Sequence, residues 1–167
     1  MAELFTAYGK AAMYAACLEN SLILLIALAR SSSLCDGFSF EHNKLKQKTL
    51  GALINEAKKS SIFSSESNKN LDLILKYRNW MVHDIARDAL GFILQKDGNA
   101  ILANTLCELS EFFHETSEMV YAKIAELCEL RGINQADIDN LVKSVFEAQI
   151  EPDKSNNQNA SKTDSFV

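Results

Sequence analysis

The side chains with the greatest chemical potential lie in one short segment, KYRNWMVHD, at residues 76–84. Arg78 carries a permanent positive charge, and removing a guanidinium from water costs free energy unless it meets a carboxylate or another anion. His83 follows five positions later, and an imidazole whose pKa lies near neutrality can transfer protons at physiological pH. The polar Asn79 directly follows the arginine. Anion binding and proton transfer are therefore the chemistry that this segment suggests.

The segment is typical of a helix that places Arg78 at the centre of an apolar stripe. The stripe steps by four and three residues, as in a seam that faces other helices, and it comprises Leu71, Leu75, Arg78, Val82, Ile85, Ala89 and Phe92. Asn79 and His83, four positions apart, share one flank of it. An arginine in such a seam predicts a polar pocket, a second subunit or a carboxylate partner. Glu19 is the candidate partner, and His83 would then be a satisfied, partly buried imidazole.

Apolar periodicity predicts the helices that must position this seam. Long helices are expected at residues 2–30, 44–59, 71–92 and 102–127, with a final helix at 134–149. Asn68 or Asn70 is expected to cap the third helix, Gly132 to end the fourth, and Asn134 to cap the last. KDGN, at residues 96–99, predicts a turn, with a short β-hairpin as the alternative. The predicted fold class is all-α, an up-down helical bundle of four main helices plus a C-terminal helix.

The chain has 167 residues, which suits one domain with a full core. One proline and six glycines favour long helices over a sandwich or barrel. We expect one helical domain over residues 1–150 and a disordered polar tail over residues 151–167. Trp80 lies on the opposite side of the helix from the seam, so we expect it to pack on a neighbouring helix, with stacking on a base as the alternative.

The cysteines and histidines give no sign of a metal site. No CxxC spacing occurs, which favours reduced, buried thiols at Cys17, Cys35, Cys107 and Cys128. His42 and His114 lack ligand spacing and are expected to be surface or packing residues. The longest apolar run, LILLIALA, is too short to span a bilayer, and the first residues lack the basic flank of a signal peptide. We therefore expect a cytoplasmic protein without membrane, metal or cofactor.

The net charge of −5 is unevenly distributed along the chain. Residues 39–96 contain ten Lys or Arg and six Asp or Glu, whereas residues 101–150 contain three basic and nine acidic residues. The positive charge therefore surrounds the segment that holds Arg78. A local basic surface can attract an anionic ligand to an acidic protein, although solvated lysines are the simpler interpretation.

The motif RNWMVH, in which an asparagine follows the arginine of R-x4-H, resembles the signature of the HEPN superfamily of helical domains. AYGKAAMYAACLENSLILLIAL looks like the first helix of bacterial HEPN-like proteins, and KTLGALI is similar to their TLGxLI stretch. The resemblance covers roughly residues 3–130. It implies an all-helical domain and, as in many members of the superfamily, a metal-independent endoribonuclease.

The resemblance also implies roles for individual residues. Two motif helices would face one another across the cleft of a homodimer, and Arg78 would grip the scissile phosphate of an RNA substrate. His83 would act as general base or acid on the 2′-hydroxyl and the leaving 5′-oxygen, and Asn79 would orient the phosphate or His83. The product would be a 2′,3′-cyclic phosphate. A toxin-antitoxin or phage-defence setting, with an antitoxin or regulatory protein as partner, is a further implication.

One position departs from the family pattern. Toxin-type HEPN proteins that pair with a nucleotidyltransferase antitoxin often carry R-x4-H-x-Y, and Ile85 occupies the tyrosine position here. Three interpretations stay open: a ribonuclease dimer, a non-catalytic HEPN-like dimer that acts as a regulatory or nucleotide/RNA-binding module, and an unrelated helical interaction protein in which Arg78 forms only a buried ion pair. The acidic charge of residues 101–150 suits the second, because nucleases with broad RNA affinity are usually basic.

Overall fold

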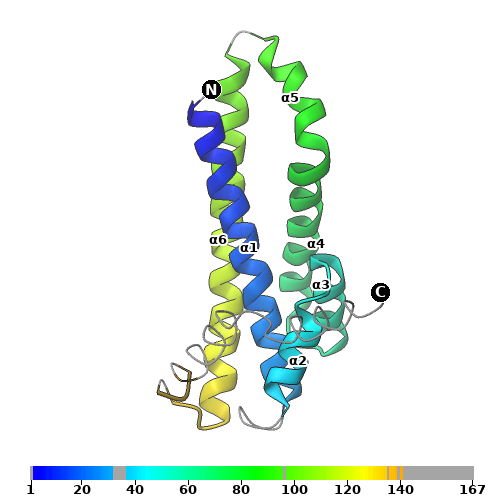
Figure 1. Ribbon diagram of the computed structural model, residues 1–167, viewed down its shortest axis with the longest axis vertical. Coiled ribbons are helices and arrows are strands. Elements are labelled where there is room, and N and C mark those ends of the chain that lie inside the picture. The colour runs from blue at the N-terminus through cyan, green and yellow to red at the C-terminus, as the bar shows by residue number, and fades with distance from the viewer. Residues whose placement is uncertain (1, 32–36, 96, 135, 139, 141–167) are drawn as a thin grey trace, which may run out of the picture.

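The computed structural model describes residues 2–31, 37–95, 97–134, 136–138 and 140, and these residues form helices joined by short turns (Figure 1). Three long rods dominate. The first is α1 (Ala2–Arg30), the last is α6 (Gly98–Leu130), and the middle rod runs through α4 (Ser65–Asn79), the π-helix η1 (Trp80–Asp84) and α5 (Ile85–Ile93). The predicted all-α class is confirmed, since no strand occurs in the described ranges, and the residues that would flank the alternative hairpin belong to helices α5 and α6.

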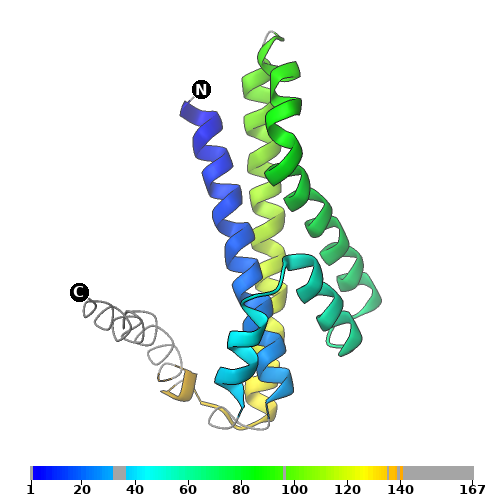
Figure 2. The ribbon, with the colours of Figure 1, turned by 45° about the vertical axis from the view of Figure 1, so that its right-hand side comes forward.

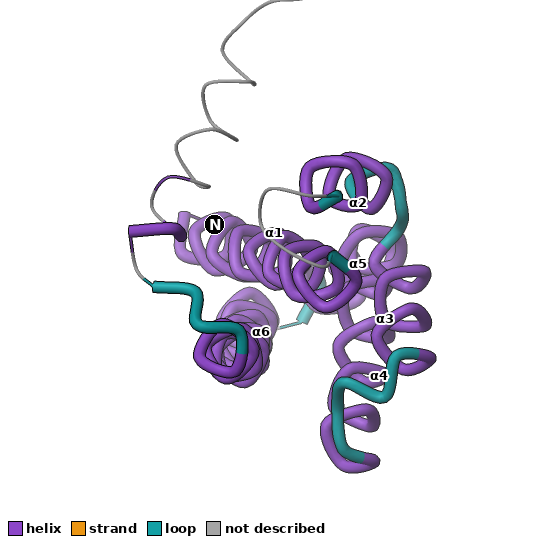
Figure 3. The backbone as a smooth tube through the Cα atoms, turned by 90° about the horizontal axis from the view of Figure 1, so that it is seen from below, coloured by secondary structure: helices purple, strands orange, loops and turns teal. Residues whose placement is uncertain are grey.

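The rods are arranged with α1 and α6 running in the same direction and the middle rod running in the opposite one (Figure 1). Two short helices, α2 (Phe38–Leu45) and α3 (Leu50–Lys59), connect the end of α1 to the start of α4. Figure 2 shows the middle rod against α6, and Figure 3 shows α2, α3 and α4 together on one side of the α1–α6 pair. The expected up-down bundle of four main helices is therefore not confirmed.

The core lies mainly between α1 and α6. The apolar residues of α1 that are fully shielded from solvent are Ala11, Leu18, Leu22, Ile26 and Ala27. The facing residues of α6 with the same shielding include Leu106, Phe113 and Val120. The three-and-four spacing of these residues makes each stripe continuous, so two helices of about thirty residues can pack along their whole length.

The parallel arrangement brings the C-termini of α1 and α6 together, where Arg131 links them. Its guanidinium donates to the carbonyl oxygens of Leu28 at 2.5 Å, Ser31 at 2.7 Å and Ala29 at 3.2 Å. A cation at this position satisfies carbonyls that have no partner within the helix and opposes the negative end of its dipole. The predicted helix end at Gly132 is confirmed, with φ +66° and the backbone N–H of Ile133 bonded to the Cys128 carbonyl at 2.9 Å.

Two helix boundaries differ from those predicted. The expected helix 44–59 is divided, because Thr49 caps α3 by accepting a hydrogen bond from the Ala52 N–H at 3.4 Å. The expected caps Asn68 and Asn70 are wrong, since α4 begins earlier and Ser64 accepts the Ser67 N–H at 3.1 Å. Short hydroxyl side chains compete for such N–H groups wherever the chain turns, and their position within a polar run is not visible from apolar periodicity.

The C-terminal segment is described only at its start. Asn134 accepts the Asp137 N–H at 3.1 Å, and Asp137 in return accepts the Asn134 N–H at 3.0 Å. This reciprocal pair confirms Asn134 as a cap. Most of the expected final helix and the whole of the tail at residues 151–167 lie outside the described residues.

Among the described helices, α1 alone is long and apolar enough to cross a membrane, with a mean hydropathy of 1.8 in its most apolar window. The expectation that no segment could span a bilayer rested on the eight-residue run LILLIALA alone, whereas the whole helix Ala2–Arg30 is long and apolar enough. More than half of that window, 56%, is buried inside the protein, as in the core helix of a soluble protein. Length and composition alone therefore do not distinguish a membrane-spanning helix from the core helix of a soluble protein.

Candidate functional site

The segment that holds Arg78 and His83 is not the continuous α-helix that its periodicity predicts. Arg78 and Asn79 are the last two residues of α4, and His83 lies within the π-helix η1. The N–H of Ile85 donates to the carbonyl of Trp80, five residues back, where an α-helix would bond residues four apart. Single π-turns inside α-helices are rare and often occur at functional sites.

The π-turn changes how the three candidate side chains face one another. Around an α-helix, Arg78 and His83 would point about 140° apart, at about 100° per residue. A turn closed by an i→i+5 hydrogen bond contains about one residue more than an α-turn, so a residue five positions on lies much closer to the same face. The π-turn therefore reduces the angle between the side chains of Arg78 and His83 from that of an uninterrupted α-helix, although Arg78 and Asn79 themselves lie in α4.

The structure departs from the predicted seam at two positions. Val82 was expected to face inward but is 47% exposed, and Leu75 is only partly buried. Ile74 and Met81 are the buried residues in their place. The rest of the predicted seam is confirmed on both sides of the π-turn, because Leu71 is buried and Ile85, Ala89 and Phe92 pack partly buried against the core.

Arg78 is half-buried, whereas Asn79 and His83 are exposed. The proposed internal ion pair is not formed: within the described part of the chain, no carboxylate, that of Glu19 included, lies within 4.0 Å of the Arg78 guanidinium. His83 is likewise not the satisfied, partly buried imidazole of that alternative. All three side chains are therefore accessible to a ligand from solution.

A network of polar side chains runs beside the π-turn. The indole N–H of Trp80 donates to Asp88 Oδ2 at 2.8 Å. The other oxygen of Asp88 lies 3.4 Å from Arg87 Nε, and Arg87 Nη2 lies 3.0 Å from Asp84 Oδ1. The network connects the first and last residues of η1 to α5 and stabilises the widened turn. Trp80 packs against the core as expected. Its hydrogen-bond partner Asp88 lies eight positions away and outside the RNWMVH motif, so the motif did not predict this bond.

Ion pairs neutralise part of the positive charge of residues 39–96. Lys48 lies 2.8 Å from Glu56, which also pairs with Arg30, and Lys58 lies 2.5 Å from Asp72. The hydrogen bonds from Lys48 and Arg30 lower the pKa of Glu56 to about 2. The positive surface near Arg78 is accordingly weaker than the residue counts suggest.

The other histidines and the cysteines lie away from the motif. His42 stacks on Phe38 and its pKa is lowered by burial and by Lys46, while the ring of His114 lies against that of Tyr14 with the planes tilted by 31°. Cys17 and Cys107 are exposed, which corrects the expectation of buried thiols, whereas burial raises the pKa of Cys128; Cys35 lies outside the described residues. Over the described ranges, no three His, Cys, Asp or Glu side chains cluster as metal ligands.

An exposed apolar row begins directly at the motif. Val82, Ala86 and Leu90 follow one another at four-residue intervals, and the two larger side chains are 47% and 64% exposed. Residues four apart lie on one side of a helix. The row therefore continues from the candidate site along the outer side of α5.

Comparison with protein-family models, curated proteins and solved structures gives no match for this chain. The function must therefore follow from the chain's own residues and their geometry.

Proposed function

We propose that the protein is a metal-independent endoribonuclease of the HEPN type that acts as a homodimer. The observation that supports this most directly is the half-buried Arg78, which has no carboxylate partner among the described residues and lies one π-turn from the exposed His83. An arginine held in this way covers part of its side chain without gaining an ion pair. A phosphate from outside the chain would supply the missing charge.

The chemistry needs only proton transfer and charge stabilisation. One His83 takes the proton of a ribose 2′-hydroxyl, whose oxygen attacks the adjacent phosphorus as the bond to the 5′-oxygen breaks. A protonated His83 of the second copy donates to that leaving oxygen, which gives a 2′,3′-cyclic phosphate and a 5′-hydroxyl. Arg78 stabilises the negative charge on the phosphoryl oxygens, and Asn79 orients the phosphate or the imidazole.

Dimerisation is supported by the apolar row of Val82, Ala86 and Leu90. Such a row on a monomer surface marks an interaction surface, and a two-fold axis beside it would bring two copies of the motif together. The burial of α1 is compatible with a soluble protein, and the cytoplasmic location stays a prediction. The toxin-antitoxin or phage-defence setting stays an implication of the resemblance.

RNA cleavage in EDTA tests the proposal. We expect the wild-type protein to leave 2′,3′-cyclic ends, and His83→Ala to lower the rate at least about a hundredfold, the lower range for loss of a general acid or base. His114→Ala is the matched control, because this exposed histidine lies on α6 away from the motif. Undiminished cleavage by His83→Ala, or no cleavage by a folded dimer, would refute the proposed role.

A second candidate function, binding or regulation without catalysis, is favoured by the charge of α6. This helix carries six glutamates, all exposed, against Lys123 as its one basic residue. Such a surface repels a polyanion. Under this alternative, wild-type protein and His83→Ala would bind the same ligand equally well, and neither would cleave RNA.

A further inference from the structure

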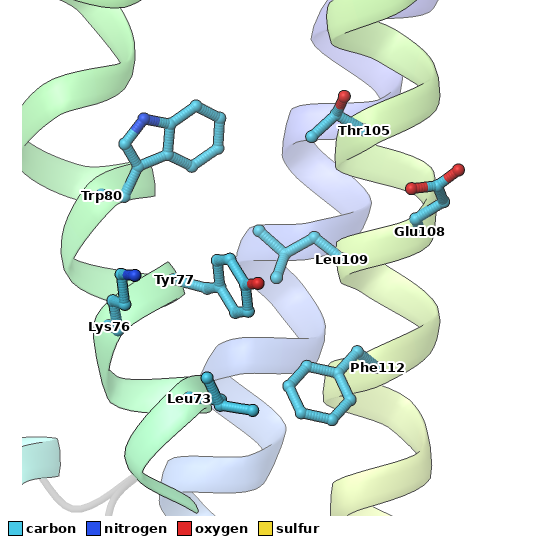
Figure 4. A pocket seen from close by; sticks show the side chains of 8 residues that line it. All are labelled: Leu73, Lys76, Tyr77, Trp80, Thr105, Glu108, Leu109 and Phe112. Carbon is cyan, nitrogen blue, oxygen red and sulfur yellow. The ribbon is translucent and has the colours of Figure 1, made fainter. Parts of the chain in front are cut away.

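A groove separate from the motif face lies between the middle rod and α6 (Figure 4). Its volume is about 540 Å³, within the range of small-molecule sites. The walls are mostly apolar and aromatic, formed by Leu73, Tyr77, Trp80, Leu109 and Phe112. Tyr77 and Leu73 are 40% and 42% exposed, so large apolar surfaces face the groove without being covered.

The aromatic side chains suit a flat ring. Figure 4 shows Tyr77 projecting from the middle rod toward Leu109 and Phe112 on α6, with Trp80 one turn further along the same rod, at the level of Thr105. The rings of Tyr77 and Phe112 meet edge to face, with centroids 6.3 Å apart and planes at 86°. Aromatic faces of this kind bind nucleobases by stacking.

The polar groups of the groove select among flat ligands. Glu108 stands on the α6 wall, and its carboxylate accepts hydrogen bonds but cannot donate them. Thr105, one turn earlier, donates its hydroxyl proton to the Ile101 carbonyl at 3.0 Å, so only its lone pairs remain for a ligand. Lys76 stands on the opposite wall (Figure 4). Neither Lys76 nor Glu108 has an ion-pair partner among the described side chains.

We propose that this groove binds the guanine base of a nucleotide, with the base against Trp80 and Tyr77 and the phosphate toward Lys76. The Watson–Crick edge of guanine presents two adjacent donors, N1–H and the 2-amino group, which match a carboxylate. The corresponding edge of adenine presents one donor beside the N1 acceptor, which Glu108 would repel. The charges also match, because the ligand's anionic end meets the cation and its donor edge meets the anion.

Trp80 is the only tryptophan of the chain, so its fluorescence reports on the groove directly. We expect GMP to change this fluorescence saturably and AMP to bind at least about tenfold more weakly, the discrimination of a good bidentate base contact. Glu108→Gln should remove most of that preference, because an amide accepts only through its one oxygen. The matched control is Glu129→Gln, an exposed glutamate at the far end of α6.

The phosphate contact is tested by comparing GMP with guanosine. Lys76→Met should abolish the advantage of GMP, whereas Lys69→Met, an exposed lysine two turns earlier on α4, should preserve it. Equilibrium dialysis with labelled GMP serves as a second measurement that does not depend on fluorescence.

The source of the base is identified with short 2′-O-methyl oligonucleotides, which cannot be cleaved through the 2′-hydroxyl. Tighter binding of a guanine-containing oligonucleotide than of GMP indicates a guanine within RNA, and the reverse order indicates a free nucleotide. No saturable binding of GMP or oligonucleotide, equal binding of GMP and AMP, or an unaltered preference in Glu108→Gln would overturn the proposal. None of these binding measurements requires RNA cleavage. A failure of the guanine proposal is therefore distinguishable from a failure of the proposed ribonuclease activity.

Discussion

Replacing Arg78 by leucine is expected to stabilise the protein while removing its proposed function. The arginine lies half-buried beside the inner side of the middle rod, where Ile74 is 0% and Met81 is 2% exposed. Its guanidinium has no ion pair with any described carboxylate, so the substitution breaks none there. Functional sites commonly keep residues that bind a ligand but lower the stability of the fold.

The size of the effect follows from burial. Arginine and leucine have similar intrinsic helix propensities, so the backbone contributes little difference. Fully burying a leucine side chain is worth about 1.5–3 kcal/mol, and a half-buried position offers about half of that. We therefore expect Arg78→Leu to raise the free energy of unfolding by about 1 kcal/mol, which is near the lower end of the range for a half-buried leucine.

Urea unfolding followed by far-ultraviolet circular dichroism would measure this change. The oligomeric state of each variant must be established first and the protein concentration held constant, since dimerisation makes stability depend on concentration. Arg87→Leu is the matched control: its side chain is 74% exposed and pairs with Asp84 and Asp88. Exposed pairs contribute little, so the control should change stability by less than about 1 kcal/mol.

The opposite result would refute the reasoning. If Arg78→Leu lowers the free energy of unfolding by more than about 1 kcal/mol, Arg78 is a structural residue with a stabilising partner. A stabilised variant that still cleaves RNA at the wild-type rate would separate Arg78 from the proposed chemistry.

Three further predictions concern the fold. Arg131→Met should lower the free energy of unfolding by about 2 kcal/mol, because three carbonyls at the end of α1 lose a charged donor; a loss under about 0.5 kcal/mol in urea unfolding would contradict this. Phe113→Ala should cost about 3–5 kcal/mol at a fully buried position, and Phe113→Leu clearly less, which thermal unfolding would show. Because its partners lower the pKa of Glu56 from 4.5 to about 2, this carboxylate stabilises the protein fully above pH 4.5 and loses its contribution as the pH falls toward 2. The stability difference between wild type and Glu56→Gln should therefore shrink over that interval, and a constant difference would argue against the ion pairs with Arg30 and Lys48.

The long helices could be predicted from the sequence because their buried faces are encoded by local spacing. The prediction of a helix at residues 2–30 is confirmed. The end at Gly132 and the cap at Asn134 were also predictable, since left-handed backbone and a reciprocal cap depend on few neighbouring residues. These features need little knowledge of the rest of the chain.

The candidate site was predictable in composition but not in geometry. Arg78, Asn79 and His83 are identified by residue type and spacing, and their catalytic role stays a prediction. The π-turn that orients them was not predicted, because the segment has a periodicity compatible with an uninterrupted α-helix. The choice between a π-turn and an uninterrupted α-helix depends on the packing of α5 on α6 and on the hydrogen bond between Trp80 and Asp88. Neither contact is visible in the apolar spacing of this segment.

The sequence by itself determined the helical class, the apolar faces of α1 and α6 and the residues able to bind an anion or transfer a proton, because each depends on residue type and short-range spacing. Only the tertiary structure decided that α1 and α6 run in parallel, that Arg78 lacks a carboxylate partner among the described residues, and that Lys76 and Glu108 stand on opposite walls of an aromatic groove. These properties depend on which helices become neighbours. Helix packing, unlike helix formation, is set by contacts between residues far apart in the chain.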